Sequence, residues 1–201
     1  MQIINNIDQG SSEWLDLRLG FITASKFKDV IAGGAGKTRK SYMLQIAAEI
    51  VTGERLPTFS NSAMEWGTAT EPQARSMYEL ENCVTVEEIA FAYFDDKKIG
   101  CSPDGLIGND GLVEFKCPNT TTQIETFLSG KMPTGPKPQV QGQLWVMDRD
   151  WCDFVSFDPR INGASSYFCQ RIYRDEVYIK ELSSKCDLFL GELGDLVEKL
   201  K

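Results

Sequence analysis

Histidine is absent from all 201 positions of the sequence. Serine–histidine and cysteine–histidine nucleophiles need an imidazole, and so do histidine-ligated metal centres, so these chemistries are excluded. Any catalysis has to come from carboxylates, lysines and hydroxyl groups.

Other common signals are also missing. The six cysteines are scattered singly with no C-x-x-C pair, which argues against a zinc site or a disulfide framework and favours reduced thiols. No apolar run approaches the roughly 20 residues of a membrane helix. The N-terminus has neither a basic segment nor an apolar core typical of a signal peptide. We therefore expect a cytoplasmic protein with no membrane contact.

Length and composition favour one globular domain over residues 1–201, since 42% of residues are hydrophobic and 25% are charged. The net charge of −8 argues against a protein that coats DNA without specificity. A local basic groove would still permit contact with nucleic acid, because net charge sums the whole surface.

Most of the candidate catalytic residues lie in one stretch, around a predicted turn at residues 108–111. A turn at residues 108–111 lies between short apolar runs and predicts a β-hairpin. Glu114 and Lys116 are two positions apart on the return strand, so they share one face, while Val113 and Phe115 point to the other and can be core. The hairpin can bring Asp104 beside Glu114. Two carboxylates suit a hard cation such as Mg²⁺, and a lysine can orient or deprotonate a water beside it.

The segment Pro103-Asp104 followed by Glu114-Phe115-Lys116 fits the PD-(D/E)xK nuclease signature. The longer sequence around this signature resembles the bacteriophage lambda type alkaline exonucleases, the YqaJ-like viral recombinase nucleases. The resemblance lies in Cys-Ser-Pro-Asp-Gly-Leu and then Gly-Leu-Val-Glu-Phe-Lys-Cys-Pro. The resemblance implies an α/β fold with a restriction-endonuclease-like core, in which helices flank a mixed central sheet.

The same resemblance implies an activity and its partners. These are 5′-to-3′ digestion of linear double-stranded DNA from its ends, dependent on Mg²⁺ with Mn²⁺ as a substitute, which leaves 3′ single strands for phage recombination. A ring-shaped homotrimer, a partner single-strand annealing protein and the cytoplasm of a bacterial host are implied as well.

Two further stretches extend the resemblance. Trp14 to Ser25 matches the family segment that grips the 5′-phosphate of the DNA end, which implies that role for Arg18 and Ser25, with Ser102 as a third ligand. Arginine suits bidentate phosphate recognition. Trp14 itself is expected to be core.

The second of these stretches runs from Met64 to Glu71. The resemblance implies that Glu71 completes the metal-site carboxylates beside Asp104, Glu114 and the Phe115 carbonyl. It also implies that Met64 is an apolar wedge against the terminal base pair.

A helix beginning at Gln139 follows the hairpin and a Pro/Gly-rich loop. Gln139 and Gln143 share one face of such a helix, and Gln141 shares another with Trp145. The family match assigns Gln141 to orienting the nucleophilic water or the phosphate.

Other elements follow from pattern. We expect helices over 41–53, 62–75 and 174–201, with a kink or a new start at Pro72, and two strands over 151–157 and 167–173.

Three alternatives remain open. The first is a PD-(D/E)xK endonuclease, and the second is a catalytically silent module that binds DNA ends. The third is a P-loop nucleotidase, because Gly36-Lys37-Thr38 ends like a Walker A loop, although Ile31 stands where that motif needs glycine.

Overall fold

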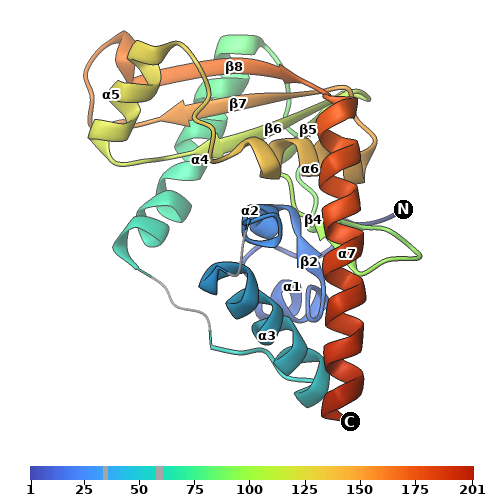
Figure 1. Cartoon of the computed structure of the whole chain (residues 1–201). Coiled ribbons are helices and arrows are strands. Elements are labelled where there is room, and N and C mark those ends of the chain that lie inside the picture. The colour runs from blue at the N-terminus through green and yellow to red at the C-terminus, as the bar shows by residue number, and fades with distance from the viewer. Residues whose placement is uncertain (34–35, 58–60) are drawn as a thin grey trace.

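The computed structural model describes residues 1–33, 36–57 and 61–201. Its described part contains two four-stranded sheets surrounded by helices (Figure 1). The first sheet has the order β1 (Gln2–Ile4), β3 (Phe91–Tyr93), β4 (Ile99–Cys101) and β2 (Ile22–Thr23). The second has the order β5 (Gly105–Ile107), β6 (Gly111–Lys116), β7 (Trp151–Phe157) and β8 (Tyr167–Tyr173).

Seven α-helices and two short 3₁₀ turns complete the described part of the chain. They are α1 (Ser12–Leu17), η1 (Ala24–Lys26), α2 (Phe27–Val30), α3 (Lys37–Thr52), α4 (Ser62–Asn82), α5 (Thr120–Ser129), α6 (Lys137–Met147), η2 (Ala164–Ser166) and α7 (Glu176–Leu200). None of the helices in these ranges is both long and apolar enough to cross a bilayer.

Both sheets are mixed. β2 pairs parallel to β4, and β6 pairs parallel to β7, while the other neighbours are antiparallel. The expected α/β class with flanking helices is confirmed, but the expected single central sheet is divided in two. The division falls at residues 102–104, between β4 and β5, where Pro103 has no N–H to offer a strand ladder.

The second sheet is covered on both faces. One face packs with the first sheet and with α3, α6 and α7 in a large core that includes Leu112 and Cys152. The other face packs against α4 through Val113, Phe115 and Val155, with Tyr78 and Ala74 opposite them. In Figure 1, α4 lies against this sheet and the long α7 runs down the side of α3 and α6.

Helix α4 differs from expectation, since it continues through Pro72 to Asn82 instead of breaking. Its buried residues Thr70, Ala74 and Tyr78 lie four apart, on both sides of the proline. Pro72 itself is exposed. Packing of one continuous face on the sheet thus outweighs the local cost of the proline.

Other predictions from the sequence concern the cysteines, the later strands and helix, and the Walker-like stretch. All six cysteines, each within the described residues, are free thiols as expected. The expected strands at 151–157 and 167–173 are β7 and β8, and the expected C-terminal helix is α7. The Walker-like stretch lies partly outside the described residues, and Lys37 is the first residue of α3.

Candidate active site

The hairpin of β5 and β6 places the predicted carboxylate–lysine set. Gly105 pairs with Val113 and Ile107 with Gly111, so Asp104 lies just before the ladder and next to Glu114. Strand alternation places Glu114 and Lys116 on the opposite face from Phe115, whose ring packs edge-on against Tyr78 of α4. The predicted faces of this strand are therefore confirmed.

Asp104 and Glu114 open into a small cavity of about 180 Å³ that is also lined by Glu71 and Lys116. The Asp104 carboxylate accepts a hydrogen bond from the Phe115 backbone N–H at 2.6 Å. Three acids from three different segments thus meet one ammonium group in a space large enough for only a few waters.

Glu114 is 1% exposed, and three side chains hold both of its oxygens. Lys116 Nζ and Gln139 Nε2 donate to Oε1, each at 2.5 Å, and Gln143 Nε2 donates to Oε2 at 2.6 Å. The Oε1 atom of Gln143 is buried without a hydrogen-bond partner, although it lies in a side chain that lines the cavity. It is an acceptor that a water or another donor in the cavity can use.

The electrostatics show crowding of negative charge. Burial raises the pKa of Asp104 well above its usual range, and the Glu114 and Glu71 carboxylates raise it further. Burial likewise raises the pKa of Glu71. Burial alone would lower the pKa of Lys116, but the three nearby carboxylates outweigh it and raise that pKa. Lys116 is therefore held as an ammonium ion, and the cavity favours added positive charge.

The structure places Gln141 away from the carboxylates, contrary to the prediction. It lies on the other face of α6, where its Nε2 donates to the Tyr173 carbonyl and its Oε1 accepts from the Asp175 backbone N–H, both at 2.9 Å. The structure therefore does not bring Gln141 to the carboxylates. Gln139 and Gln143 reach them instead, and their i, i+4 spacing on one helix face was the signal for this.

The three residues matched to phosphate binding line the same small cavity as the carboxylates. Arg18 follows α1 and donates from Nη2 to the Thr23 hydroxyl at 3.3 Å. That hydroxyl lies 3.3 Å from the Ser25 hydroxyl. Ser102 precedes Asp104 and donates to the Ala90 carbonyl at 2.7 Å. Arg18, Ser25 and Ser102 are thus brought together, although their roles stay predictions.

Arg18 is a half-buried cation that makes no ion pair with any residue in the described ranges. Its Nε is buried with no hydrogen-bond partner, and burial lowers its pKa to about 10. A half-buried guanidinium with a spare donor can bind an anion through charge-assisted hydrogen bonds.

Trp14 has more than the core role expected for it. Its ring stacks against the Arg18 guanidinium, 3.8 Å from the ring centroid. Its Nε1 donates to the Ala90 carbonyl at 2.8 Å and to the Ser102 hydroxyl at 3.1 Å. Trp14 therefore fixes two of the three predicted phosphate ligands. The Ser11 cap of α1, whose hydroxyl accepts from the Trp14 N–H, begins the helix that orients it.

Met64 lies at the start of α4 and is 55% exposed. It lines a second cavity of about 570 Å³, which shares Glu71, Phe115 and Lys116 with the small cavity. The predicted wedge residue is thus solvent-exposed and lines a cavity next to the carboxylates, and its role stays a prediction.

The oxygen ligands around the small cavity bear on whether it can hold a divalent cation. In the described ranges, no three His, Cys, Asp or Glu side chains come close enough to form a metal-ligand group on their own. A Mg²⁺ site needs fewer, because Mg²⁺ commonly takes one or two carboxylates and fills its shell with water and phosphate oxygens. Asp104, Glu114 and Glu71 line the small cavity, so carboxylates are available there, while the metal-binding roles of these residues and of the Phe115 carbonyl stay predictions. Burial and the neighbouring carboxylates raise the pKa of Asp104, so a cation bound in the cavity would stabilise its ionised form.

Comparison with known proteins identifies the family. The YqaJ-like viral recombinase domain model matches residues 13–150. A crystal structure of LHK-Exo in complex with dAMP has a TM-score of 0.89 and 41% identity, covering 95% of this chain and 96% of that chain. The alkaline exonuclease LHK-Exo from Laribacter hongkongensis has a TM-score of 0.88 and 40% identity, covering 94% and 96%.

A phage-related exonuclease from Haemophilus somnus 129PT, at 16% identity with a TM-score of 0.65 over 90% of this chain and 96% of that one, agrees in fold. No curated protein matches the chain. The chain therefore belongs to the YqaJ-like viral recombinase family, as its motifs indicated.

Proposed function

We propose that this protein is a Mg²⁺-dependent exonuclease that digests linear double-stranded DNA in the 5′-to-3′ direction. The nuclease class rests on the family and on alkaline exonuclease relatives at about 40% identity. The proposed direction and metal dependence are supported by one cavity. It joins Asp104, Glu114 and Lys116 to the unpaired guanidinium of Arg18.

That juxtaposition supports the direction of digestion. A terminal 5′-phosphate on Arg18, Ser25 and Ser102 would place the next phosphodiester at the carboxylates. Water attacks that phosphorus and the bond to the 3′ oxygen breaks, releasing a 5′-mononucleotide. The shortened strand then carries a new 5′-phosphate, which is the group that Arg18 binds in the next cycle.

The other residues of the candidate site would have separate roles in the reaction. Asp104, Glu114, the Phe115 carbonyl and Glu71 would hold one or two Mg²⁺ ions, with Mn²⁺ as a substitute, which supply Lewis-acid polarisation of the phosphate and an activated water. Lys116 is kept protonated by its neighbours, so orienting and stabilising charge on the phosphate suits it better than removing a proton.

Three further parts of the proposal concern the substrate, the assembly and a partner protein. Met64 would press against the terminal base pair, because a bulky apolar side chain can unstack DNA bases. A homotrimeric ring around the duplex would keep the substrate after each cut. A single-strand annealing protein would receive the 3′ strand during phage recombination in the host cytoplasm. Light scattering of the free protein, with the trimer mass as the expected value, tests the ring.

The deciding experiment uses linear duplex DNA labelled at one 5′ or one 3′ end, with Mg²⁺ or EDTA. We expect early release of the 5′ label, abolished by EDTA and by Lys116→Ala or Asp104→Asn. Lys180→Ala, an exposed lysine of α7, is the matched control. Closed circular DNA should remain intact.

The alternatives give different results in the same experiment. Cutting of closed circles would identify an endonuclease. Binding of ends without any cleavage in Mg²⁺ or Mn²⁺ would leave a DNA-end-binding module. Either result would overturn the proposed exonuclease.

A further inference from the structure

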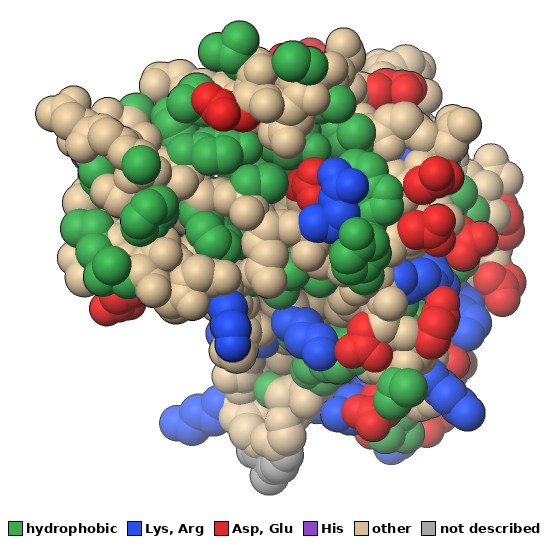
Figure 2. Space-filling view, turned by 90° about the horizontal axis from the view of Figure 1, so that it is seen from above, with side chains coloured by type: hydrophobic (Ala, Val, Ile, Leu, Met, Phe, Trp, Pro, Cys, Tyr) green, Lys and Arg blue, Asp and Glu red, His purple; other side chains and the backbone are tan. Residues whose placement is uncertain are grey.

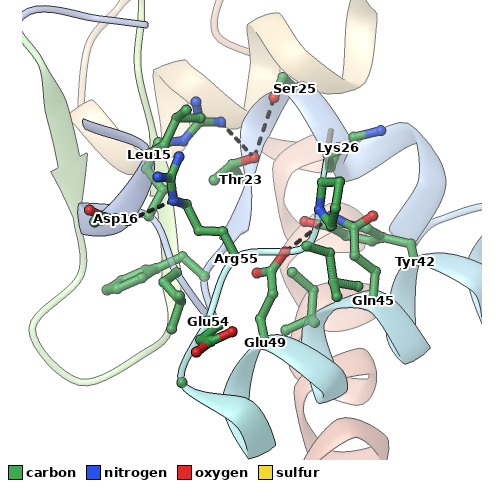
Figure 3. Close-up of a pocket in the computed structure, with 17 residues that line it drawn as sticks. Leu15, Asp16, Thr23, Ser25, Lys26, Tyr42, Gln45, Glu49, Glu54 and Arg55 are labelled. Carbon is green, nitrogen blue, oxygen red and sulfur yellow. Dashed lines mark hydrogen bonds and ion pairs between the residues drawn. The ribbon is translucent and has the colours of Figure 1, made fainter. Parts of the chain in front are cut away.

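The hydroxyl of Thr23 connects two of the three predicted phosphate ligands. Arg18 Nη2 donates to it at 3.3 Å, and the Ser25 hydroxyl also lies 3.3 Å from it. Both interactions meet at the Thr23 oxygen in Figure 3. All three side chains line the small cavity of the candidate active site. Thr23 thus links a cation and a hydroxyl that are predicted to bind the same phosphate.

The first sheet determines where this hydroxyl lies. β2 pairs parallel to β4, with Thr23 opposite Gly100. Because the two strands run in the same direction, Ser25 and Ser102, each two residues further along the chain, leave the same end of the sheet. Thr23 is only 5% exposed, whereas Ser25 is exposed. A buried residue of the sheet therefore lies directly behind the more accessible hydroxyl of Ser25.

Thr23 also supplies an orientation that the Trp14 stack leaves undetermined. The Trp14 ring covers the Arg18 guanidinium at 3.8 Å from the ring centroid. Such a stack attracts the cation and fixes its plane, but it leaves the guanidinium free to turn within that plane. Among the described residues, the Thr23 hydroxyl is the acceptor of a hydrogen bond from this guanidinium. That bond determines the directions of the N–H groups that remain for a ligand.

The capacity of a hydroxyl group assigns Ser25 as a donor. A threonine hydroxyl has one proton to donate and two lone pairs that accept. Burial raises the pKa of Tyr42 on α3, and hydrogen bonds from the backbone N–H and the hydroxyl of Thr23 lower it. Since the Thr23 proton is directed to Tyr42, its lone pairs accept from Arg18 and Ser25. One oxygen atom therefore holds donors from both predicted phosphate ligands.

We propose that Thr23 is a positioning residue for the terminal phosphate, whose hydroxyl orients Arg18 and Ser25 and so sets the preference for 5′-phosphorylated ends. This inference rests on the phosphate-binding role of Arg18 and Ser25 in the proposed function. A phosphate oxygen takes over the Ser25 proton, while Arg18 keeps its bond to Thr23 and donates its other N–H groups to the phosphate. Donors that are already oriented bind more tightly, because less ordering is needed on binding.

Thr23→Val tests this role, because valine keeps the β-branched shape and removes the hydroxyl. Initial rates are measured on hairpin duplexes with one open end that carries either a 5′-phosphate or a 5′-hydroxyl. On phosphorylated ends we expect KM to rise about five- to tenfold and kcat to change less than about twofold, because binding is lost equally in the ground and transition states. On 5′-hydroxyl ends both constants should change less than about twofold. Thr23→Ser, which keeps the hydroxyl, should stay within about twofold of the wild type.

Equilibrium binding gives a second readout that does not depend on cleavage. Fluorescence anisotropy of the same hairpins in EDTA, labelled in the closed loop, measures the ratio of Kd values for hydroxyl and phosphate ends. Thr23→Val should reduce this ratio about fivefold. Tyr42→Phe removes the acceptor of the Thr23 proton, which then competes with the proton of Ser25, so the ratio should fall about two- to threefold.

Thr120→Val is the matched control for loss of a threonine hydroxyl. The Thr120 hydroxyl donates to Asp158 at 2.7 Å, and this residue does not line the small cavity. The control variant should keep the wild-type ratio of Kd values.

Three results would overturn the role of Thr23. An equal loss on both kinds of end in Thr23→Val would make this residue structural. An unchanged preference in both Thr23→Val and Tyr42→Phe, in a wild type that does prefer phosphorylated ends, would sink the inference and leave the proposed function intact. A wild type that digests and binds both ends equally would overturn the phosphate-binding role of Arg18 and Ser25, and the role of Thr23 with it.

Discussion

At the scale of single residues, the phosphate-binding role proposed for Arg18 predicts that the protein distinguishes 5′-phosphorylated from 5′-hydroxyl DNA ends. Arg18→Lys keeps the charge but loses the planar fork of donors that suits a phosphate. We expect kcat/KM on 5′-phosphorylated ends to fall about tenfold or more, since hydrogen bonds to a charged group contribute about 1.5–3 kcal/mol each. On 5′-hydroxyl ends the rate should change by less than about threefold. An equal loss on both ends would make Arg18 a structural residue.

The three glutamines of α6 offer a second contrast at this scale. Gln143 holds Glu114, whereas Gln141 ties α6 to the segment between β8 and α7. We expect Gln143→Leu to lower kcat about 10–100-fold, the usual cost of losing a residue that orients a metal ligand. Gln141→Leu should instead lower the free energy of unfolding by about 1–3 kcal/mol, because it removes two part-buried hydrogen bonds, to the Tyr173 carbonyl and from the Asp175 N–H, worth about 0.5–1.5 kcal/mol each.

Kinetics and urea unfolding of the two variants decide between these roles. A large kcat loss in Gln141→Leu without a stability change would restore the catalytic role first assigned to that residue. Gln139→Leu, which removes the other amide on Glu114, should resemble Gln143→Leu.

Residue-level prediction succeeded where the information is local. Alternation along one strand and a four-residue turn suffice to place Glu114 and Lys116 together and Asp104 nearby. Gln141 was predicted at the site from the family match, but the structure places it on another face of α6. The sequence shows which α6 residues share a face, but it does not show which face meets the sheet. That choice depends on packing, such as the Phe27 ring that occupies the space beside Gly142. Trp14 was underestimated for a similar reason, since its partners Ala90 and Ser102 are distant in sequence.

At the scale of elements, a buried polar network connects α4 to β7 and β8. The Tyr78 hydroxyl donates to Asp153 at 2.8 Å, and Arg171 donates to both oxygens of that carboxylate, each at 2.8 Å. Asp153 is 2% exposed. We expect Tyr78→Phe to lower the free energy of unfolding by about 1.5–3 kcal/mol at pH 7, because a buried carboxylate loses a donor. Urea unfolding measures this loss.

The same tyrosine predicts a pH dependence. Burial raises the pKa of Tyr78 well above its ordinary value of 10.0, and the hydrogen bond to Asp153 adds to the rise. The folded state therefore keeps the phenol proton that the unfolded state releases. The stabilisation is complete below about pH 10 and is lost as the pH rises from there toward the folded-state pKa.

Urea midpoints measured from pH 7 to pH 11 check this expectation. Stability should decline above about pH 10, and the decline should be smaller in Tyr78→Phe. Tyr173→Phe, which changes a tyrosine that is 68% exposed, is the control and should follow the wild type. An identical decline in all three proteins would contradict the role of Tyr78.

Element prediction was least successful where tertiary contacts compete with local rules. Pro72 signals a break, but the face formed by Thr70, Ala74 and Tyr78 packs continuously on the second sheet and keeps α4 in one piece. The two sheets were expected as one because the family resemblance implies a single mixed central sheet. The segment 102–104 instead leaves the ladder and carries two of the predicted site residues.

At the scale of the whole molecule, the net charge of −8 is reconciled with DNA binding by distribution. The face seen in Figure 2 carries acidic and basic side chains interspersed, with apolar groups between them. Arg18, the cation predicted to bind the DNA end, is half-buried and lines the same small cavity as the carboxylates. Binding should therefore depend more on the enclosed end of the strand than on long-range attraction along the duplex.

Residues 1–201 should unfold as one domain, because the large core draws on both sheets. Ile22 and Ile99 of the first sheet, Leu112 of the second, and residues of α3 and α7 belong to one cluster. Leu112 is fully buried, so Leu112→Ala should lower the free energy of unfolding by about 2–5 kcal/mol. We expect hydrogen-exchange protection to fall by the same free energy in peptides from β4 and from β6. Retained protection in the first sheet would instead divide the chain into two domains, each with its own stability.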